Sequence, residues 1–213
     1  PDRSYTSLRN ILSTYCQIPE DFILPGNGSS ELISLLIEER RPKHTMILGP
    51  TYSEYSRELG FSDSTIDCFY LKPEQDFQLS VEELCLALAK KQIDFLILCN
   101  PNNPTGQVLN PPLLKEIVER CCDNNILLAV DECFMEFLPL WKEYTAKSLV
   151  TRTTNLIVID AFTKTYSLAG FRLGFCASGN TGLLSSMRLY GQNFAVSTPA
   201  QLAGICALKD DPI

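Results

Sequence analysis

The strongest structural signal in the chain is the sequence LIVIDAFTKTYSLAGFR, residues 156–172. Its first four residues are apolar without alternation, which is typical of a strand buried on both faces. Lys164 follows this strand within a few residues, so we expect its amine to be desolvated, and desolvation favours the neutral form that Schiff-base chemistry needs. Thr163 and Arg172 add a hydroxyl and a planar cation, two groups that hold phosphate well.

Strand-like and helix-like segments alternate on both sides of this sequence. Apolar periodicity predicts strands at 46–48, 65–71, 95–99, 126–130, 156–159 and 173–176, and helices at 4–16, 29–40, 53–59, 81–91, 112–123, 183–190 and 199–208. Strands this apolar indicate an α/β fold in three layers, with a mostly parallel sheet covered by helices. Ligands in such folds bind beyond the carboxyl ends of the strands. Residues 138–155 lack clear periodicity, which favours a surface excursion over a functional lid.

Composition narrows the class of protein. The 213 residues are enough for one large α/β domain or two small ones, and 45% hydrophobic with 20% charged residues is typical of a globular chain. The net charge of -7 and the scattered lysines and arginines argue against nucleic-acid binding, and the apolar runs are too short for a membrane span. The nine cysteines include no CxxC pair, so we interpret them as reduced thiols of a cytoplasmic protein.

Two further strands are followed by polar residues. NPNNPTG, residues 100–106, predicts a rigid turn that presents asparagine side chains, although a simple Asx-turn explains it equally well. Asp131 ends the apolar run 126–130, and a carboxylate there needs a cationic partner. A metal ion is disfavoured because the single histidine, His44, lies elsewhere in the sequence, so a protonated ring nitrogen is the better candidate.

Two shorter motifs precede or follow other elements. GNGSSE, residues 26–31, comes directly before a predicted helix, where free backbone amides and hydroxyls can bind an anion or simply cap the helix. GPTY, residues 49–52, follows a strand and presents Tyr52, either as a stacking partner for a ring or as an ordinary half-buried tyrosine.

The order GNGSSE, PTY, NPNNPTG, Asp-Glu and TKTYSLAGFR resembles that of the class I/II aminotransferases, which are pyridoxal 5'-phosphate (PLP) enzymes of fold type I. The resemblance is strongest to the branch of threonine-phosphate decarboxylases and histidinol-phosphate aminotransferases. It implies that Lys164 binds the cofactor covalently and is catalytic, that Asp131 pairs with the ring nitrogen, that Asn103 donates to the phenolic oxygen and that Tyr52 stacks on the ring. The implied phosphate ligands are Gly28, Ser29, Ser30, Thr163 and Arg172.

The resemblance covers residues 1–213 as a PLP-binding large domain. It implies that the chain is an excerpt, without the N-terminal arm and without the small C-terminal domain that carries a carboxylate-binding arginine. It also implies a homodimer, in which a tyrosine directly before Pro1 reaches the cofactor phosphate of the partner subunit.

One departure bears on the reaction. Phe134 occupies a position where transaminases of this branch place a tyrosine, and the missing hydroxyl is worth about 1 kcal/mol in a buried polar site. This favours a threonine-phosphate decarboxylase-like enzyme that acts on a small phosphorylated amino acid. A histidinol-phosphate aminotransferase is the alternative, and an aminotransferase-like sensor domain of a transcription regulator is the second. A dinucleotide-binding module is disfavoured because no GxGxxG follows a strand.

Overall fold

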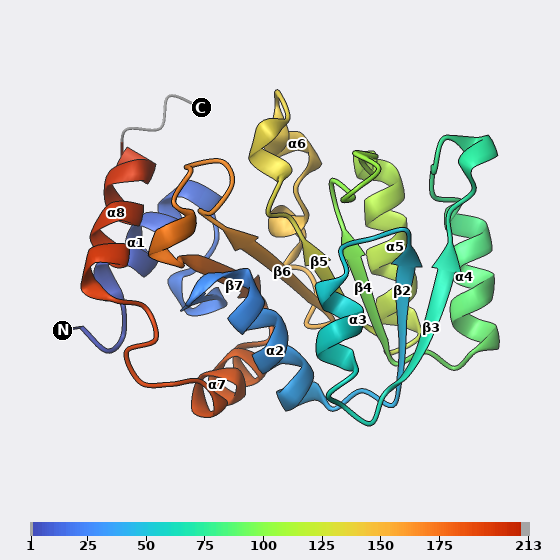
Figure 1. Ribbon diagram of the computed structural model, residues 1–213, viewed down its shortest axis with the longest axis horizontal. Helices are drawn as coiled ribbons and strands as arrows, with labels where there is room; N and C mark the ends of the chain where they lie inside the picture. The colour runs from blue at the N-terminus through green and yellow to red at the C-terminus, as the bar shows by residue number, and fades with distance from the viewer. Residues whose placement is uncertain (1, 210–213) are drawn as a thin grey trace.

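The computed structural model describes residues 2–209 and contains one seven-stranded sheet with the strand order β1-β7-β6-β5-β4-β2-β3 (Figure 1). The strands are β1 (Ile23–Gly26), β2 (His44–Gly49), β3 (Thr65–Tyr70), β4 (Phe95–Cys99), β5 (Leu127–Asp131), β6 (Leu156–Ala161) and β7 (Gly174–Ser178). The pairings among β2 to β6 are parallel, whereas β7 runs antiparallel to both β6 and β1. The prediction of a mostly parallel sheet is therefore confirmed.

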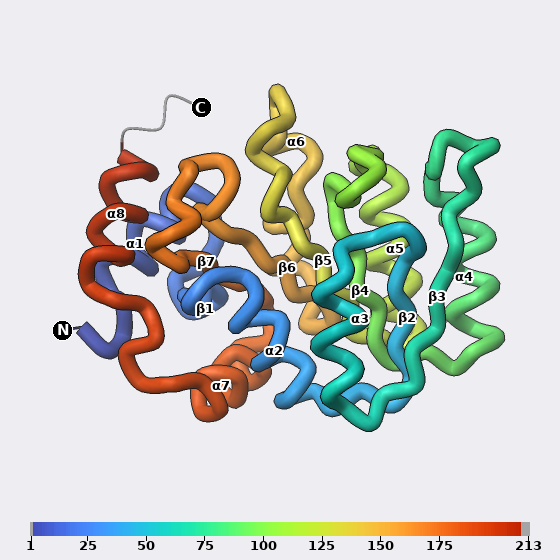
Figure 2. Tube along the Cα trace, viewed as in Figure 1, coloured from blue at the N-terminus to red at the C-terminus, as the bar shows by residue number. Residues whose placement is uncertain are grey.

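Helices cover both faces of the sheet. They are α1 (Thr6–Cys16), α2 (Gly28–Arg40), α3 (Glu54–Leu59), α4 (Val81–Lys90), α5 (Pro111–Asp123), α6 (Trp141–Tyr144), α7 (Thr181–Tyr190) and α8 (Thr198–Lys209). Short 3₁₀ helices are η1 (Glu20–Phe22), η2 (Pro73–Gln75), η3 (Met135–Phe137), η4 (Ala146–Leu149) and η5 (Ala169–Phe171). Helices α1 and α8, from opposite ends of the described chain, pack side by side (Figure 2).

Each face of the sheet has its own hydrophobic core. One core joins the sheet to α2, α3 and α7, and the other joins it to α1, α4, α5 and α8. In β4, Leu96 and Leu98 belong to the second core, whereas Ile97 and Cys99 belong to the first. Because successive side chains of a strand point to opposite faces, a sheet covered on both sides needs apolar residues at every position. This explains the absence of polar alternation in the sequence.

Among the strands of the described chain, β1 is the one that the periodicity does not predict. It is only four residues long and contains Pro25, which has no amide hydrogen for a central ladder. The structure places it at the edge of the sheet, paired only with β7, where a proline is tolerated. Its position matters because it leads directly into Asn27 and the first residue of α2.

The expected surface excursion at residues 138–155 is wrong for part of that segment. Trp141, Ala146, Lys147 and Val150 are all buried, Trp141 and Lys147 at 2% and 1% exposure. In Figure 1, α6 stands at the end of the sheet toward which the arrows of β2 and β3 point. The segment thus packs near the carboxyl ends of the parallel strands. The tyrosine expected before Pro1, and Pro1 itself, lie outside the described residues.

Candidate active site

The start of α2 and the segment between β6 and β7 together form a cradle. Gly28 begins α2 with a φ of +82°, a conformation that L side chains rarely adopt, and a Cβ built on it would lie 2.7 Å from Nη2 of Arg172. Gly174 is equally constrained, since its Cβ would lie 2.9 Å from the backbone nitrogen of Ser29. Gly28 thus lets the guanidinium of Arg172 lie against the start of α2, and Gly174 lets the start of β7 approach the backbone of the same turn. This arrangement of cation and free amides suits an anionic group.

The serines of the GNGSSE motif do not cap α2 in the way that the simple capping alternative requires. Asn27 is the N-cap residue, its side chain makes no capping hydrogen bond, and its amide donates to Oε2 of Glu31 at 2.6 Å. Ser29 and Ser30 are half-buried in the first turn of the helix. Glu31 thus satisfies the N-cap amide as the acidic residue of a capping box does, whereas the motif offers no side-chain cap from Asn27.

Asp131 is buried, with 5% of its surface exposed, at the carboxyl end of β5. The sequence led us to expect a cationic partner, but the structure gives it two neutral donors. Its Oδ2 accepts from the hydroxyl of Tyr55 at 2.7 Å, and its Oδ1 accepts from the amide of Cys133 at 3.0 Å. Tyr55 lies in α3 and is fully buried, so its role was not visible from the sequence motifs. These bonds fix the orientation of the carboxylate.

Tyr52 lies beside this carboxylate. Its ring meets that of Tyr55 edge to face at 5.6 Å. Burial raises the pKa of Tyr52, the charges of Glu54 and Asp131 raise it further, and Arg172 opposes them. Tyr52, Asp131 and Arg172 are therefore close enough to interact electrostatically, although they come from three distant parts of the sequence.

Lys164 is exposed, so the desolvation expected from its place after β6 is absent in the described chain. The strand ends at Ala161, and the chain then turns before it reaches the lysine. The ammonium of Lys164 lies 5.5 Å from the ring centroid of Phe134. Phe134 follows β5 and Lys164 follows β6, so two adjacent parallel strands bring the pair together.

Asn102 makes the hydrogen bonds that hold the NPNNPTG loop in place, whereas Asn103 is the residue predicted to bind the cofactor. Asn102 is buried, accepts from the hydroxyl of Thr51 and donates to the carbonyl of Pro50 and to Thr105. Asn103 is only half-buried and lines a cavity of about 310 Å³ together with Phe134. The loop thus uses Asn102 for its own structure and presents Asn103 at the side of the site where Phe134 lies.

A second polar cluster near these strand ends was missed by the sequence analysis. It consists of Lys147 with Glu132, Glu136 and Asp160, and all four residues are buried. Two signals could have found it: Glu132 directly follows Asp131 at the end of an apolar strand, and Asp160 interrupts the apolar run of β6. Both are carboxylates in positions that need a partner.

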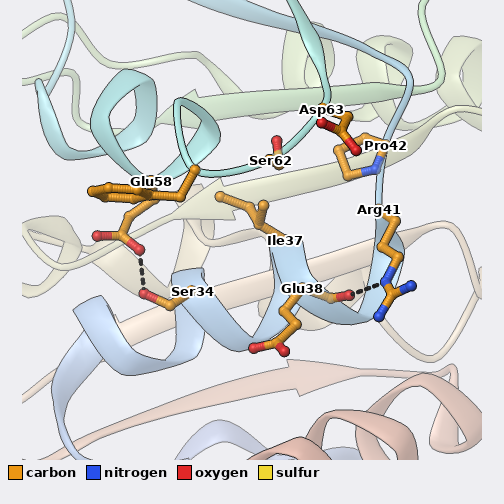
Figure 3. A pocket seen from close by; sticks show the side chains of 9 residues that line it. Ser34, Ile37, Glu38, Arg41, Pro42, Glu58, Ser62 and Asp63 are labelled. Atoms are coloured by element: carbon orange, nitrogen blue, oxygen red, sulfur yellow. Dashed lines mark hydrogen bonds between the residues drawn. The ribbon is translucent and has the colours of Figure 1, made fainter.

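A cavity of about 470 Å³ lies away from these residues, between the C-terminal half of α2 and the end of α3 (Figure 3). Glu38, Glu58 and Asp63 contribute carboxylates to its wall, and Arg41 contributes a guanidinium. Ser34 donates to Glu58 across it at 2.5 Å. None of the predicted site residues lines this cavity, so it does not belong to the candidate active site.

Gly28 gives the sharpest test of whether PLP fits the cradle. Any side chain at this position would displace Arg172, so the geometry keeps the guanidinium and the helix amides accessible to one anionic group such as a phosphate. Asp131, buried nearby, supplies the carboxylate that a protonated ring nitrogen requires. The fold is that of the PLP-dependent transferases of fold type I.

The chain belongs to the aminotransferase class I and II family, whose model matches residues 1–213. Members of this family are PLP-dependent enzymes. A threonine-phosphate decarboxylase of Salmonella typhimurium is 34% identical over 99% of the chain and 57% of its own length. A histidinol-phosphate aminotransferase of Desulfitobacterium hafniense is 32% identical over 98% of the chain and 57% of its length. The chain thus spans little more than half of these relatives.

Solved structures agree with the fold. The histidinol-phosphate aminotransferase of Clostridium acetobutylicum superposes with a TM-score of 0.89 at 25% identity, covering 99% of this chain and 61% of that one. The histidinol-phosphate aminotransferase of Sinorhizobium meliloti, solved in complex with pyridoxal-5'-phosphate, gives 0.88 at 20% identity, covering 99% and 56%. Among residues 2–209 there is no helix whose length and apolar character would let it cross a membrane.

Proposed function

We propose that the full-length protein is a PLP-dependent enzyme that acts at the α-carbon of a small phosphorylated amino acid, and that it is a threonine-phosphate decarboxylase-like enzyme. The observation that carries this proposal is the contact between Gly28 and Arg172 at the start of α2, on the same side of the sheet as the buried Asp131. The family membership and the 34% identical decarboxylase support it.

Each residue of the site would hold a different part of the cofactor. Arg172, Thr163 and the first turn of α2 would bind the phosphate, Asp131 the ring nitrogen, Asn103 the phenolic oxygen and Tyr52 the ring face, and Lys164 would bind the aldehyde carbon covalently. The bound ring would act as an electron sink for charge that develops at the substrate α-carbon. Tyr55 and Cys133 hold the Asp131 carboxylate in place for this role.

Lys164 would also move the proton of the reaction at its Nζ. In transamination this amine would take the proton from the α-carbon, and in decarboxylation the reaction would end with a proton delivered to that carbon. Phe134 bears on the choice between the two. Its ring faces Lys164 but offers no hydroxyl, which is why we favour decarboxylation.

Histidinol-phosphate transamination is the second candidate function, since an aminotransferase is 32% identical over almost the whole chain. Product analysis of the full-length protein separates the two. With threonine phosphate, we expect carbon dioxide and an amine phosphate. Formation of glutamate from 2-oxoglutarate with histidinol phosphate, and no release of carbon dioxide, would contradict the preferred assignment.

We further propose that the full-length protein is a cytoplasmic homodimer in which an N-terminal arm and a small C-terminal domain complete each site. The grounds are the family membership and the relatives' greater length. Sedimentation of the full-length holoenzyme should give the mass of a dimer. A fully active monomer would contradict this.

A further inference from the structure

Lys147 is a buried ammonium held by three carboxylates, which lie in β6, in η3 and just after β5. Its Nζ lies 2.5 Å from Oδ2 of Asp160 in β6, 3.1 Å from Oε1 of Glu136 in η3 and 3.4 Å from Oε2 of Glu132, which directly follows β5. Only 1% of the Lys147 surface is exposed. Such a cation is costly to bury unless its partners are well placed, and here they are.

Glu132 ties the same segment a second time. Its Oε2 accepts from the hydroxyl of Thr145 at 2.5 Å, and its Oε1 accepts from the amide of Ala146 at 2.6 Å. Three consecutive residues, Thr145 to Lys147, are thus bound to one side chain at the end of β5. The segment that contains α6 is anchored at this point to the strand that carries Asp131.

The walls of the cluster are largely apolar. The rings of Trp141 and Phe175 lie 5.1 and 5.8 Å from Nζ of Lys147. Besides the three carboxyl groups, the titratable group that faces the ammonium is the thiol of Cys16 in α1, and burial raises the pKa of this thiol to about 12. The cation of this cluster is Lys147, as its three ion pairs show.

Three carboxylates outnumber one ammonium, so the cluster binds protons more tightly than exposed groups do. Burial and the neighbouring Glu136 raise the pKa of Asp160 well above its ordinary value, and burial also raises that of Glu132. The pKa of Lys147 is also raised well above its ordinary value: burial is the largest effect and acts to lower it, but the charges of Asp160, Glu136 and Glu132 outweigh burial. Lys147 therefore remains charged, and the raised pKa of Asp160 lets its carboxyl group keep its proton at pH values where an exposed aspartate has lost it.

The cluster is connected to the site through the chain itself. Glu132 is the neighbour of Asp131, and Phe134 lies between Glu132 and Glu136 in the turn that follows β5. Asp160 lies four residues before Lys164 at the end of the adjacent strand β6. One ammonium thus holds both ends of the turn that carries Phe134 and the strand that leads to Lys164.

We propose that Lys147 is a positioning residue for the chemistry at Lys164: by binding Glu132, Glu136 and Asp160 it keeps the ends of β5 and β6 in register, so that Asp131 and Phe134 meet the amine of Lys164 in one geometry. This inference rests on the proposed PLP-dependent function. It concerns how the site is held together, and it assigns Lys147 no contact with substrate.

The test uses the full-length holoenzyme and two variants. Lys147→Met removes the cation but leaves three buried carboxyl groups without it, so this variant can fail to fold. The triple variant Lys147→Met/Glu136→Gln/Asp160→Asn removes the cation and two of the three carboxyl groups, a type of replacement that buried ion pairs often tolerate, and Glu132 keeps its hydrogen bonds from Thr145 and Ala146. Lys142→Met is the matched control, because Lys142 is an exposed lysine in α6, five residues before Lys147 in η4. The readouts are kcat, KM, and the pH midpoint at which the absorbance of the bound cofactor changes.

We expect the triple variant to fold and to bind PLP, with kcat about tenfold lower, KM within about twofold of wild type and a displaced absorbance midpoint, because misplacement near a reacting group costs rate rather than binding. Lys142→Met should match wild type in all three. A triple variant with unchanged kcat and midpoint would overturn the proposal, and so would loss of folding in both variants, which would make the cluster a stability element. A wild-type protein that binds no PLP would instead refute the proposed function.

Discussion

Asp131 and Glu132 are adjacent in the sequence, yet they serve two different regions of the molecule. Asp131 faces the α2 and α3 side of the sheet, where it accepts from Tyr55 and from the Cys133 amide. Glu132 faces the opposite side, where it binds Thr145, Ala146 and Lys147. Alternation along a strand is sufficient to separate them.

The difference lies in the partners. Within residues 2–209 the hydrogen bonds to the Asp131 carboxylate come from neutral donors, so the carboxylate remains available to a cationic ligand group. Glu132 shares an ammonium with two other carboxyl groups and is closed off from any ligand. The same contrast separates the lysines, since Lys164 is exposed and Lys147 is 1% exposed. A buried charge with a permanent counter-ion serves structure, whereas a buried charge held by neutral donors is suited to chemistry.

The largest effect is expected for Lys164→Ala, because Lys164 is the exposed lysine that we propose binds the cofactor. The full-length variant should still bind PLP noncovalently, but turnover should fall by roughly 10²–10⁴-fold as proton transfer is lost. Borohydride should attach the cofactor of the wild-type protein to the peptide that contains Lys164. Recovery of the label on another lysine, Lys147 included, would break the contrast between the two lysines.

The next effect separates the roles of the two adjacent carboxylates, Asp131 and Glu132. Asp131→Asn and Glu132→Gln are the same isosteric change at neighbouring positions. We expect Asp131→Asn to lower kcat by roughly 10²–10³-fold with little loss of stability, because it removes electrostatic stabilisation of developing charge. Glu132→Gln should lower the free energy of unfolding more than Asp131→Asn does, and it should lower kcat less. Both variants are assayed for kcat and for unfolding in urea. Equal losses of kcat would mean that Glu132 is as important for turnover as Asp131.

A smaller effect is expected in the phosphate cradle. Gly28→Ala places a Cβ where Nη2 of Arg172 now lies, so we expect the affinity for PLP to fall about tenfold, the loss of roughly one hydrogen bond to a charged group. Gly106→Ala is the control, since Gly106 also has a positive φ, +71°, but open space beside it. Titration of the apoprotein with PLP measures both. If the two variants lose the same affinity, backbone strain explains the loss and Arg172 is not a ligand.

Most of the fold could be predicted from the sequence because a sheet covered on both faces leaves a plain signal of continuous apolar strands. Strand β1 could not, since four residues with a proline carry no periodicity, and the partner that makes them a strand, β7, is about 150 residues away. The burial of Lys147 was equally hidden, because it depends on Glu132, Glu136 and Asp160 from other parts of the chain, and the buried Trp141 stacks on the distant Tyr15.

The site residues were predicted from motifs at strand ends, and the structure places several of these motifs at one edge of the sheet. Parallel strands bring their carboxyl ends to one edge, so Asn103, Asp131 and Lys164 follow adjacent strands β4, β5 and β6. The supporting residues escaped prediction. Tyr55 looks like any core tyrosine of a helix, and only the three-dimensional approach of α3 to β5 gives its hydroxyl a carboxylate partner.

The smallest effect concerns the pH dependence of the free energy of unfolding that arises from the buried cluster of Lys147, Glu132, Glu136 and Asp160. Burial and Glu136 raise the pKa of Asp160 well above 3.8, so from about pH 4 upward the folded state keeps a proton that the unfolded chain has released. Stability therefore falls as the pH rises through this interval, by at most about 1.4 kcal/mol per pH unit for one proton. Asp160→Asn removes the titration and should flatten the curve of unfolding free energy against pH, measured in urea from pH 5 to 8. Asp123→Asn, an exposed change at the end of α5, should run parallel to wild type. If the Asp160→Asn curve is also parallel to wild type, Asp160 holds no extra proton in the folded state, and its pKa is not raised by the cluster.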